Sequence, residues 1–298
     1  MRGHLLIFTA NVLFGISLPV FKYLLSEGFP PEAITWMRAA FACVAFWAVS
    51  VVQPCERVSR RDLLLLMVCG LCGVGINQWL FVIGMRLSSP FDMSVIGASV
   101  PLFVLLLSAL VLGERITRSK SAGILVGAAG ALLLIAASSG NGGGGSSVRG
   151  DLLQIANCMM FAVYLVLSKP LSSRYSSVTM MRWMFLASTV VLAPFCIGSL
   201  PSAPLFAVAT FSWLHLAALF YLLFFATFLA FMLVSMSIHL VRPTTVSIYN
   251  YVQPVVASVI AILVGQDSFS WQKLLAALLV FLGVWLVTQD SKSHIEIR

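Results

Sequence analysis

The chain has 298 residues, of which 60% are hydrophobic and only 9% are Asp, Glu, Lys or Arg, and its net charge is +8 at pH 7. Soluble domains carry about 25% charged residues, so this composition excludes an ordinary soluble protein and indicates a surface that faces lipid. An outer-membrane barrel is also excluded, because its strands alternate polar and apolar residues and the apolar runs here are continuous. The positive charge is better explained by loops that orient a membrane protein than by a nucleic-acid partner.

Long apolar runs follow one another along the whole chain. A helix needs about 20 apolar residues to cross roughly 30 Å of hydrocarbon, so the runs predict an all-α integral membrane protein with ten transmembrane helices. The breaks between them carry Gly, Pro, Ser or charged residues. The predicted spans are residues 4–25, 31–52, 62–85, 90–112, 117–137, 151–171, 177–199, 212–236, 243–264 and 270–289.

A Gly/Ser-rich segment, residues 138–150, divides the chain almost in half and includes the run Gly142–Gly145. Such a composition is typical of a flexible linker. The predicted organisation is therefore a first five-helix unit at residues 1–137, the linker, and a second five-helix unit at residues 151–298.

The basic residues predict how the chain is oriented. With the N-terminus in the cytoplasm, Arg38 and Arg182 lie within spans, four of the other Lys and Arg residues lie outside, and the remaining 12 lie at cytoplasmic ends and loops. This bias favours two cytoplasmic termini and an extracytoplasmic linker. The four outer residues are Lys22, Arg86, Arg149 and Lys273.

The two halves share matched positions. Residues 34–38, which end in Arg38, match residues 178–182, which end in Arg182, and one constant offset relates several later positions. Since each half has five spans, the second half must enter the membrane in the opposite sense. Inverted repeats are typical of secondary transporters, which bind substrate near the midplane between the repeats. The other matched pairs are Asn11 with Asn157, Ser94 with Ser247, Val95 with Ile248, Pro101 with Pro254, Glu114 with Asp267, Lys120 with Lys273 and Gly130 with Gly283.

Two five-helix repeats, an arginine in the second helix of each, and the turn Gly113-Glu114-Arg115-Ile116 resemble the drug/metabolite transporter superfamily, in particular the bacterial EamA-type permeases. The resemblance covers nearly the whole chain. It implies ten helices around a central cavity in the bacterial inner membrane, and outward movement of amino acids, related metabolites or drugs. One departure is that the second repeat has Gln266-Asp267 where the first has Gly113-Glu114.

The ninth span has the densest cluster of polar residues: Tyr249, Asn250, Tyr251 and Gln253. Polar side chains in the middle of a span are costly and need a reason. Tyr249 and Gln253 are four residues apart and share a helix face, which predicts a substrate-binding surface. The alternative is hydrogen bonding between helices, which is common in membrane bundles.

Other candidate substrate-binding residues lie in the third span and in the first span of each half. Gln78 aligns with Phe231, so the halves differ at this depth, which suggests a substrate bound off the pseudo-axis. Trp79 is either a wall of the pocket or a lipid-facing residue. The full set from these spans is Asn77, Gln78, Trp79, Asn11, Asn157 and Tyr164.

Matched basic and proline residues are candidates for gating or structural roles. Arg38 and Arg182 lie roughly a third of the way into their spans, at 1.5 Å per residue. Snorkelling to the interface is one explanation, and direct binding of an anion is another. Proline frees a carbonyl and kinks a helix, so matched kinks can act as hinges or fix helix shape. The remaining members of this group are Pro101, Pro254, Lys22 and Lys169.

All ten acidic residues and all four histidines fall in loops or near the ends of the predicted spans. A proton relay normally needs such groups inside the membrane, which suggests a facilitator or exchanger. We expect no cofactor, no metal site and no enzymatic activity, since the Cys69-Gly-Leu-Cys72 pair is more typical of helix packing than of a metal site. A channel is not favoured either, because neither a ring of charged residues nor a filter-like glycine run stands out in the sequence.

The predicted function is alternating-access transport of a small polar or zwitterionic metabolite, with amino-acid export favoured. The expected partners are the small-molecule substrate and membrane lipid, and the expected state is a monomer or homodimer. A multidrug efflux permease of the same fold is the alternative, and a scaffold or receptor that transports nothing is a more distant one.

Overall fold

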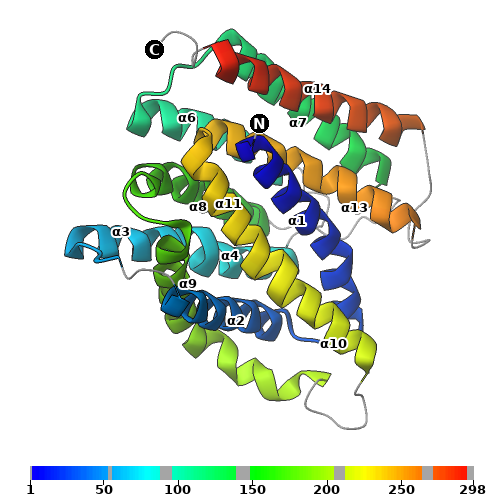
Figure 1. The fold of residues 1–298 in the computed structure, drawn as a ribbon. Helices are drawn as coiled ribbons and strands as arrows, with labels where there is room; N and C mark the ends of the chain where they lie inside the picture. The colour runs from blue at the N-terminus through cyan, green and yellow to red at the C-terminus, as the bar shows by residue number, and fades with distance from the viewer. Residues whose placement is uncertain are drawn as a thin grey trace.

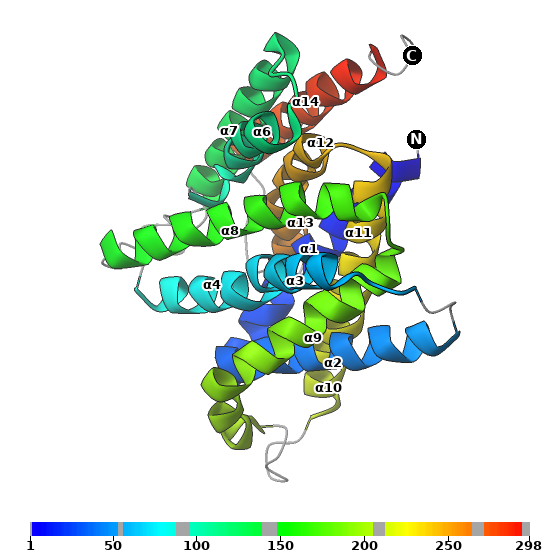
Figure 2. The same ribbon diagram turned by 90° about the vertical axis from the view of Figure 1, so that its left-hand side faces the viewer.

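The computed structural model describes residues 2–52, 56–87, 96–138, 148–204, 212–263 and 271–293, and within these ranges it contains helices and no strands. Figures 1 and 2 show the helices as a bundle in two perpendicular views. The longer α-helices are α1 (Arg2–Ser26), α2 (Pro31–Val52), α3 (Arg60–Gly70), α4 (Ile76–Leu87), α6 (Val100–Leu112), α7 (Arg118–Ser138), α8 (Val148–Ser172), α9 (Ser177–Cys196), α10 (Trp213–Phe220), α11 (Ala230–Leu240), α13 (Val252–Leu263) and α14 (Trp271–Ser293).

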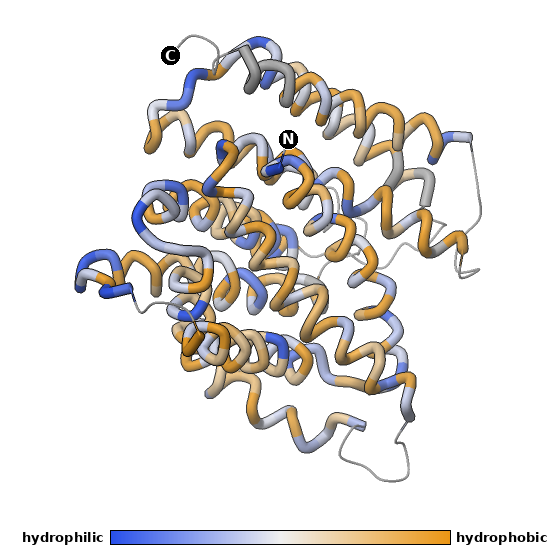
Figure 3. Tube along the Cα trace, in the orientation of Figure 1, coloured by the Kyte–Doolittle hydropathy of each residue, from blue (hydrophilic) through white to orange (hydrophobic). Residues whose placement is uncertain are grey.

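Six helices in the described part are long and apolar enough to cross a membrane, and α6 and Trp271–Val287 are shorter apolar helices. Figure 3 shows hydrophobic residues along the lengths of the helices and hydrophilic ones gathered mainly toward helix ends and connections. Large apolar side chains such as Leu106, Leu110 and Leu278 are exposed. A helix satisfies all its backbone hydrogen bonds internally, so it can present such residues to lipid. The chain is therefore a multi-pass, all-helical membrane protein.

The helix bounds agree with the predicted spans to within a few residues wherever the chain is described. Residues 90–95 of the fourth span and most of the Gly/Ser segment lie outside the described residues. Helix α8 begins at Val148, within the segment predicted as the linker. Ten membrane crossings stay a prediction.

Three of the long helical segments are interrupted by turns that are not α-helical. The π-helical segment η1 (Leu71–Gly75) joins α3 to α4, and the π-helical segment η5 (Tyr221–Leu229) joins α10 to α11. The 3₁₀ turn η6 (Tyr249–Tyr251) separates α12 (Pro243–Ile248) from α13. Single π turns inside helices occur frequently at functional sites.

Both matched prolines lie in the first turn of a helical segment and not within an unbroken helix. Pro254 is the third residue of α13, directly after η6, and Pro101 is the second residue of α6, after a turn at residues 98–99. Proline lacks the N–H that an interior helical residue donates, so it is well tolerated in a first turn. The matched prolines therefore mark matched helix breaks, one at the start of α6 and one at the start of α13.

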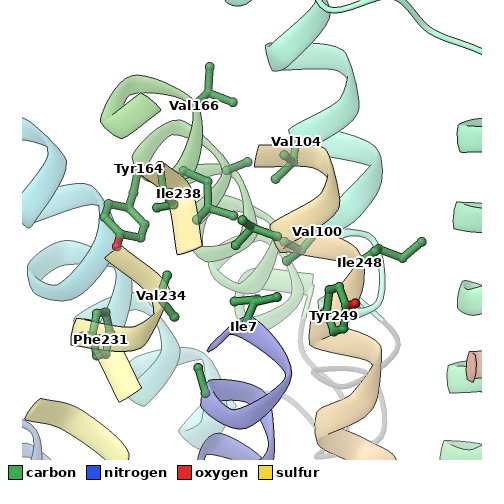
Figure 4. Close-up of a cluster of buried hydrophobic side chains, with 14 of the residues drawn as sticks. Ile7, Val100, Val104, Tyr164, Val166, Phe231, Val234, Ile238, Ile248 and Tyr249 are labelled. Atoms are coloured by element: carbon green, nitrogen blue, oxygen red, sulfur yellow. The ribbon is translucent and has the colours of Figure 1, made fainter. Parts of the chain in front are cut away.

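The two halves of the chain are interleaved in the bundle. Helix α1 packs against α11 and α13 of the second half, and α8 packs against α4 and α6 of the first half. In addition, α2 packs on α9, and α7 packs on α14; the α7–α14 pair runs along one side of the bundle in both views (Figures 1 and 2). Figure 4 shows the apolar core where the halves meet, with Ile7 of α1, Tyr164 of α8 and Phe231 of α11.

Candidate substrate pocket

A small pocket lies where α2, η1 and α4 of the first half meet η5 and α11 of the second. Its cavity volume is about 10 Å³, which is room for about one water molecule and far below the roughly 300–1,000 Å³ typical of ligand pockets, so this is a closed form of the site. Apolar side chains make part of the wall and polar ones the rest. The lining residues are Thr35, Arg38, Ala39, Val74, Gln78, Thr227 and Phe231.

Arg38 is the cationic side chain of this pocket. Its Nε donates a hydrogen bond of 2.7 Å to Oγ1 of Thr227, whose hydroxyl in turn donates to the backbone carbonyl of Leu222 at 2.7 Å. Among the described residues, Arg38 forms no ion pair with a carboxylate. The arginine is therefore held inside the bundle by a neutral hydroxyl on a π-helical segment.

Arg182, the matched arginine of the second half, has different surroundings. Its guanidinium lies 5.3 Å from the ring centre of Trp47 and 5.6 Å from that of Trp183. One of its nitrogens, Nη2, donates to the backbone carbonyl of Glu56 at 3.5 Å. Cation–π contacts of this kind stabilise a desolvated guanidinium, so Arg182 braces α2 against α9.

Two pairs of pocket residues occupy matched positions in the repeats. Val74 in η1 and Thr227 in η5 are separated by the same number of residues as Gln78 in α4 and Phe231 in α11. This is the offset that relates Pro101 to Pro254. The pocket is thus built from equivalent turns of the third span in each half. In one matched pair the second half supplies the polar residue, Thr227, and in the other the first half does, with Gln78. Thr35, Thr227 and Val74 were missed from the sequence, because their residue types are common in any membrane helix.

The ninth-span cluster makes contacts with α1 and does not line the pocket. The hydroxyl of Tyr249 is 3.2 Å from Nδ1 of His4, and Nε2 of Gln253 donates to Oδ1 of Asn11 at 2.7 Å. Gln253 also reaches Asn250 at 3.5 Å. These bonds tie α13 and η6 to α1.

Tyr251 points to a different neighbour. Its hydroxyl donates to the backbone carbonyl of Ala98 at 2.9 Å, and its ring packs where a side chain on Gly127 of α7 would otherwise be. Tyr251 therefore fills a helix-packing position.

Asn77 and Asn157 form a reciprocal pair between α4 and α8. The side-chain amide of Asn77 donates to the Asn157 carbonyl at 3.0 Å, and that of Asn157 donates to the Asn77 carbonyl at 2.6 Å. Gln78, the neighbour of this pair, is the one predicted substrate-binding residue that lines the pocket; its Nε2 is 3.4 Å from Oδ1 of Asn77.

Two aromatic candidates also lie outside the pocket lining. Trp79 packs on Phe195 with ring centres 5.3 Å apart, within a small cluster that joins α2, α4 and α9. Tyr164 is fully buried, and its hydroxyl has no hydrogen-bond partner among the described residues.

The two lysines predicted to have gating or structural roles have different surroundings. Lys169 donates to the carbonyls of Ile238 at 2.6 Å and Val241 at 3.0 Å, so it caps the C-terminal end of α11, where a positive charge is favourable. Lys22 is exposed near the end of α1.

A buried ion pair lies at the turn that follows α6, within the first half of the chain. Lys120 is 2% exposed and its Nζ lies 2.7 Å from Oε1 of Glu114, which is 4% exposed. The same carboxylate oxygen accepts a hydrogen bond from Thr244 of α12. The Gly-Glu-Arg-Ile turn is thus tied to the start of the broken ninth span.

Five cysteines in the described part are free and buried, including Cys69 and Cys72. Within the described ranges, no three His, Cys, Asp or Glu residues come together as metal ligands would. Gly70, between the two cysteines, lies so close to α9 that a Cβ there would be 2.3 Å from the Met184 carbonyl oxygen. This segment is a helix contact.

The long apolar helices define a multi-pass membrane protein, with a small cavity between its two halves. The chain belongs to the EamA-like transporter family, whose model matches residues 1–136 and 148–289. This confirms the resemblance seen in the sequence.

Individual relatives agree with the family. An uncharacterized transporter of Archaeoglobus fulgidus is 24% identical over 278 residues, which are 93% of this chain and 88% of that protein. A probable terminal-alkyne amino-acid exporter of Streptantibioticus cattleyicolor is 28% identical over 193 residues, 64% of each chain. A solved crystal structure has the same fold, with a TM-score of 0.79 at 21% identity over 98% of both chains.

Proposed function

We propose that this protein is an alternating-access secondary transporter that exports a small polar or zwitterionic metabolite, with amino acids as the favoured class, across the bacterial inner membrane. The family supports transport, and the likeness to the probable terminal-alkyne amino-acid exporter of Streptantibioticus supports an amino-acid substrate. A multidrug permease of the same fold is the alternative.

The pocket between the two halves is the observation that carries this proposal. It is nearly closed, and its walls include π-helical turns from both halves. A π turn has i→i+5 hydrogen bonds in place of the α-helical pattern, and such turns are frequent at functional sites. Movement at these two turns would open the pocket to one side of the membrane or the other.

The packing supports two inverted five-helix repeats and ten crossings. Exchanging the halves turns the packing of α1 on α11 into that of α8 on α4, and the packing of α1 on α13 into that of α8 on α6. The same exchange leaves the α2–α9 and α7–α14 contacts unchanged, because each joins a helix to its own counterpart. With an odd number of spans in each half, this relation is inverted, as in other secondary transporters. Both termini are then cytoplasmic by the distribution of Lys and Arg.

Counterflow in liposomes tests the proposal. Purified protein is reconstituted, liposomes are loaded with an unlabelled L-amino acid, and entry of the same labelled amino acid is followed with and without a proton gradient. Saturable entry that is accelerated by internal amino acid, and that does not depend on the gradient, supports an exchanger without proton coupling. A steep dependence on the gradient contradicts the uncoupled mechanism.

A pair of matched variants connects the flux to the pocket. Gln78→Leu removes a polar group that lines the pocket, and Gln272→Leu makes the same change at an exposed position of α14. The proposal predicts lost flux in the first variant and normal flux in the second. If wild-type protein moves no amino acid but moves chemically unrelated organic cations, the multidrug alternative replaces the metabolite assignment.

A further inference from the structure

We propose that Arg38 is the binding group for the carboxylate of the substrate, and that Thr227 occupies its place when the pocket is empty. This inference rests on the proposed function, since it names the chemistry of the substrate for the same pocket.

Arg38 differs from three other basic residues that are buried or half-buried in the bundle. Lys120 is paired with the carboxylate of Glu114, Lys169 is bound by two helix-terminal carbonyls, and Arg182 lies against two indole rings. Arg38 has the hydroxyl of Thr227 and, among the described residues, no carboxylate. An ionised side chain inside a membrane is costly and normally marks a functional site. An anionic ligand would supply the missing charge.

Arg38 also has N–H donors that its hydrogen bond to Thr227 does not use. A guanidinium carries five N–H donors, and one of them, on Nε, is used by Thr227. Because Arg38 lines the pocket, the rest of the group is available to a ligand there. A planar guanidinium matches a carboxylate in a two-point contact, which is stronger than a neutral hydrogen bond.

Thr227 keeps a hydrogen-bond partner when a bound carboxylate replaces it at Arg38. Its hydroxyl already donates to the Leu222 carbonyl at 2.7 Å inside η5. When Arg38 turns to a ligand, Thr227 keeps this bond and no buried donor is left unpaired. The ligand also removes the link from α2 to η5, so binding and the freedom of the π-helical segment are coupled.

The rest of the pocket describes the rest of the substrate. The Gln78 amide oxygen is an acceptor that suits an ammonium group, and Val74, Ala39 and Phe231 make an apolar wall. The cavity is closed to a ligand at about 10 Å³, so an amino acid enters only when the pocket opens. The lining residues match the parts of a zwitterion, with the carboxylate at Arg38, the amine toward Gln78 and an apolar side chain against the wall.

The test measures binding without transport. Purified protein in detergent is heated with L-alanine, L-valine or L-phenylalanine, and in parallel with the corresponding carboxamide and decarboxylated amine at equal ionic strength. We expect the carboxylates to raise the unfolding temperature and the amides and amines to have little effect. In Arg38→Gln, the apparent affinity for the carboxylates should fall at least about tenfold, and Arg38→Lys should retain part of it.

Arg174→Gln is the matched control, because Arg174 is an exposed arginine whose partner is Asp62 at the surface; its affinity should equal that of wild type. The unfolding temperature of each variant without ligand separates loss of binding from loss of fold. The inference is overturned if carboxylates and carboxamides shift the wild-type protein equally, if Arg38→Gln keeps full affinity while folded, or if no carboxylate in the panel binds.

Transport assays distinguish this failure from failure of the proposed function. If amines or cations are transported but carboxylates do not bind, the protein is a transporter and the assignment of Arg38 is wrong. If carboxylates bind through Arg38 but no labelled compound crosses the membrane, the site stands and the transport proposal fails.

Discussion

Asn77 and Asn157 each donate their side-chain amide to the backbone carbonyl of the other, at 3.0 and 2.6 Å. The pair joins α4 of the first half to α8 of the second at a buried position. Since both amides are used in this way, they act between helices and hold the wall that carries Gln78.

Asn157→Ala is expected to reduce stability more than substrate affinity. The change leaves the Asn77 carbonyl with one partner fewer, and such bonds in membrane proteins contribute about 0.6 kcal/mol on average, with a maximum of about 1.7. Unfolding in detergent and the Kd for the substrate are measured together. A large loss of affinity at unchanged stability would assign Asn157 to the binding site.

Tyr164→Phe is expected to leave stability unchanged or to raise it by up to about 1–3 kcal/mol, because the Tyr164 hydroxyl is buried with no partner among the described residues and an unpaired hydroxyl is costly. Thermal unfolding and transport are compared with wild type. If transport is lost while stability is kept, the hydroxyl contacts the substrate in another conformation.

Glu114→Gln is expected to destabilise the protein by about 3–5 kcal/mol, because it leaves the buried ammonium of Lys120 without its counter-charge. The double variant Glu114→Gln/Lys120→Met should recover part of this loss. Arg174→Gln breaks the exposed pair with Asp62 and should cost less than about 1 kcal/mol. Equal effects of the buried and exposed changes would refute this assignment.

The stability of the protein should fall in acid partly through Glu56. Burial raises the pKa of Glu56, but hydrogen bonds from Thr179 and Ser176 and the charge of Arg182 outweigh burial, so the pKa lies below its ordinary value. A lowered folded-state pKa stabilises the fold above the unfolded-state pKa, about 4.3, and this contribution disappears as the pH falls through the lowered value.

Thermal unfolding between pH 3 and 7 checks this expectation. Wild type should lose stability below about pH 4.3, and Glu56→Gln should be less stable at neutral pH and less sensitive to acid. An identical pH profile in the variant would show that Glu56 makes no contribution.

The bounds of the helices could be read from the sequence because lipid forces each crossing to be a continuous apolar run with its own backbone hydrogen bonds. The repeat offset relates Gln78 to Phe231, and the structure places both side chains in the lining of one pocket. The offset alone could not select Thr227, because a threonine in an apolar helix has many packing roles and its value here comes from facing Arg38.

The two arginines show the same limit of sequence reasoning. Arg38 and Arg182 occupy matched motifs, yet one meets a threonine and the other two tryptophans. The neighbours come from helices distant in sequence, so only packing distinguishes a pocket residue from a brace. Likewise, the sequence leaves the ninth-span cluster open to substrate binding or to bonding between helices, and only the packing shows its contacts with α1, with the turn before α6 and with α7.

The most direct test of the account is counterflow of a labelled neutral L-amino acid in liposomes that contain wild type, Arg38→Gln or Arg174→Gln, with the amount of folded protein measured in each. The account predicts saturable flux in wild type and in Arg174→Gln, and at least a tenfold loss in folded Arg38→Gln. Full saturable flux in Arg38→Gln would contradict the assignment of the pocket as the transport site.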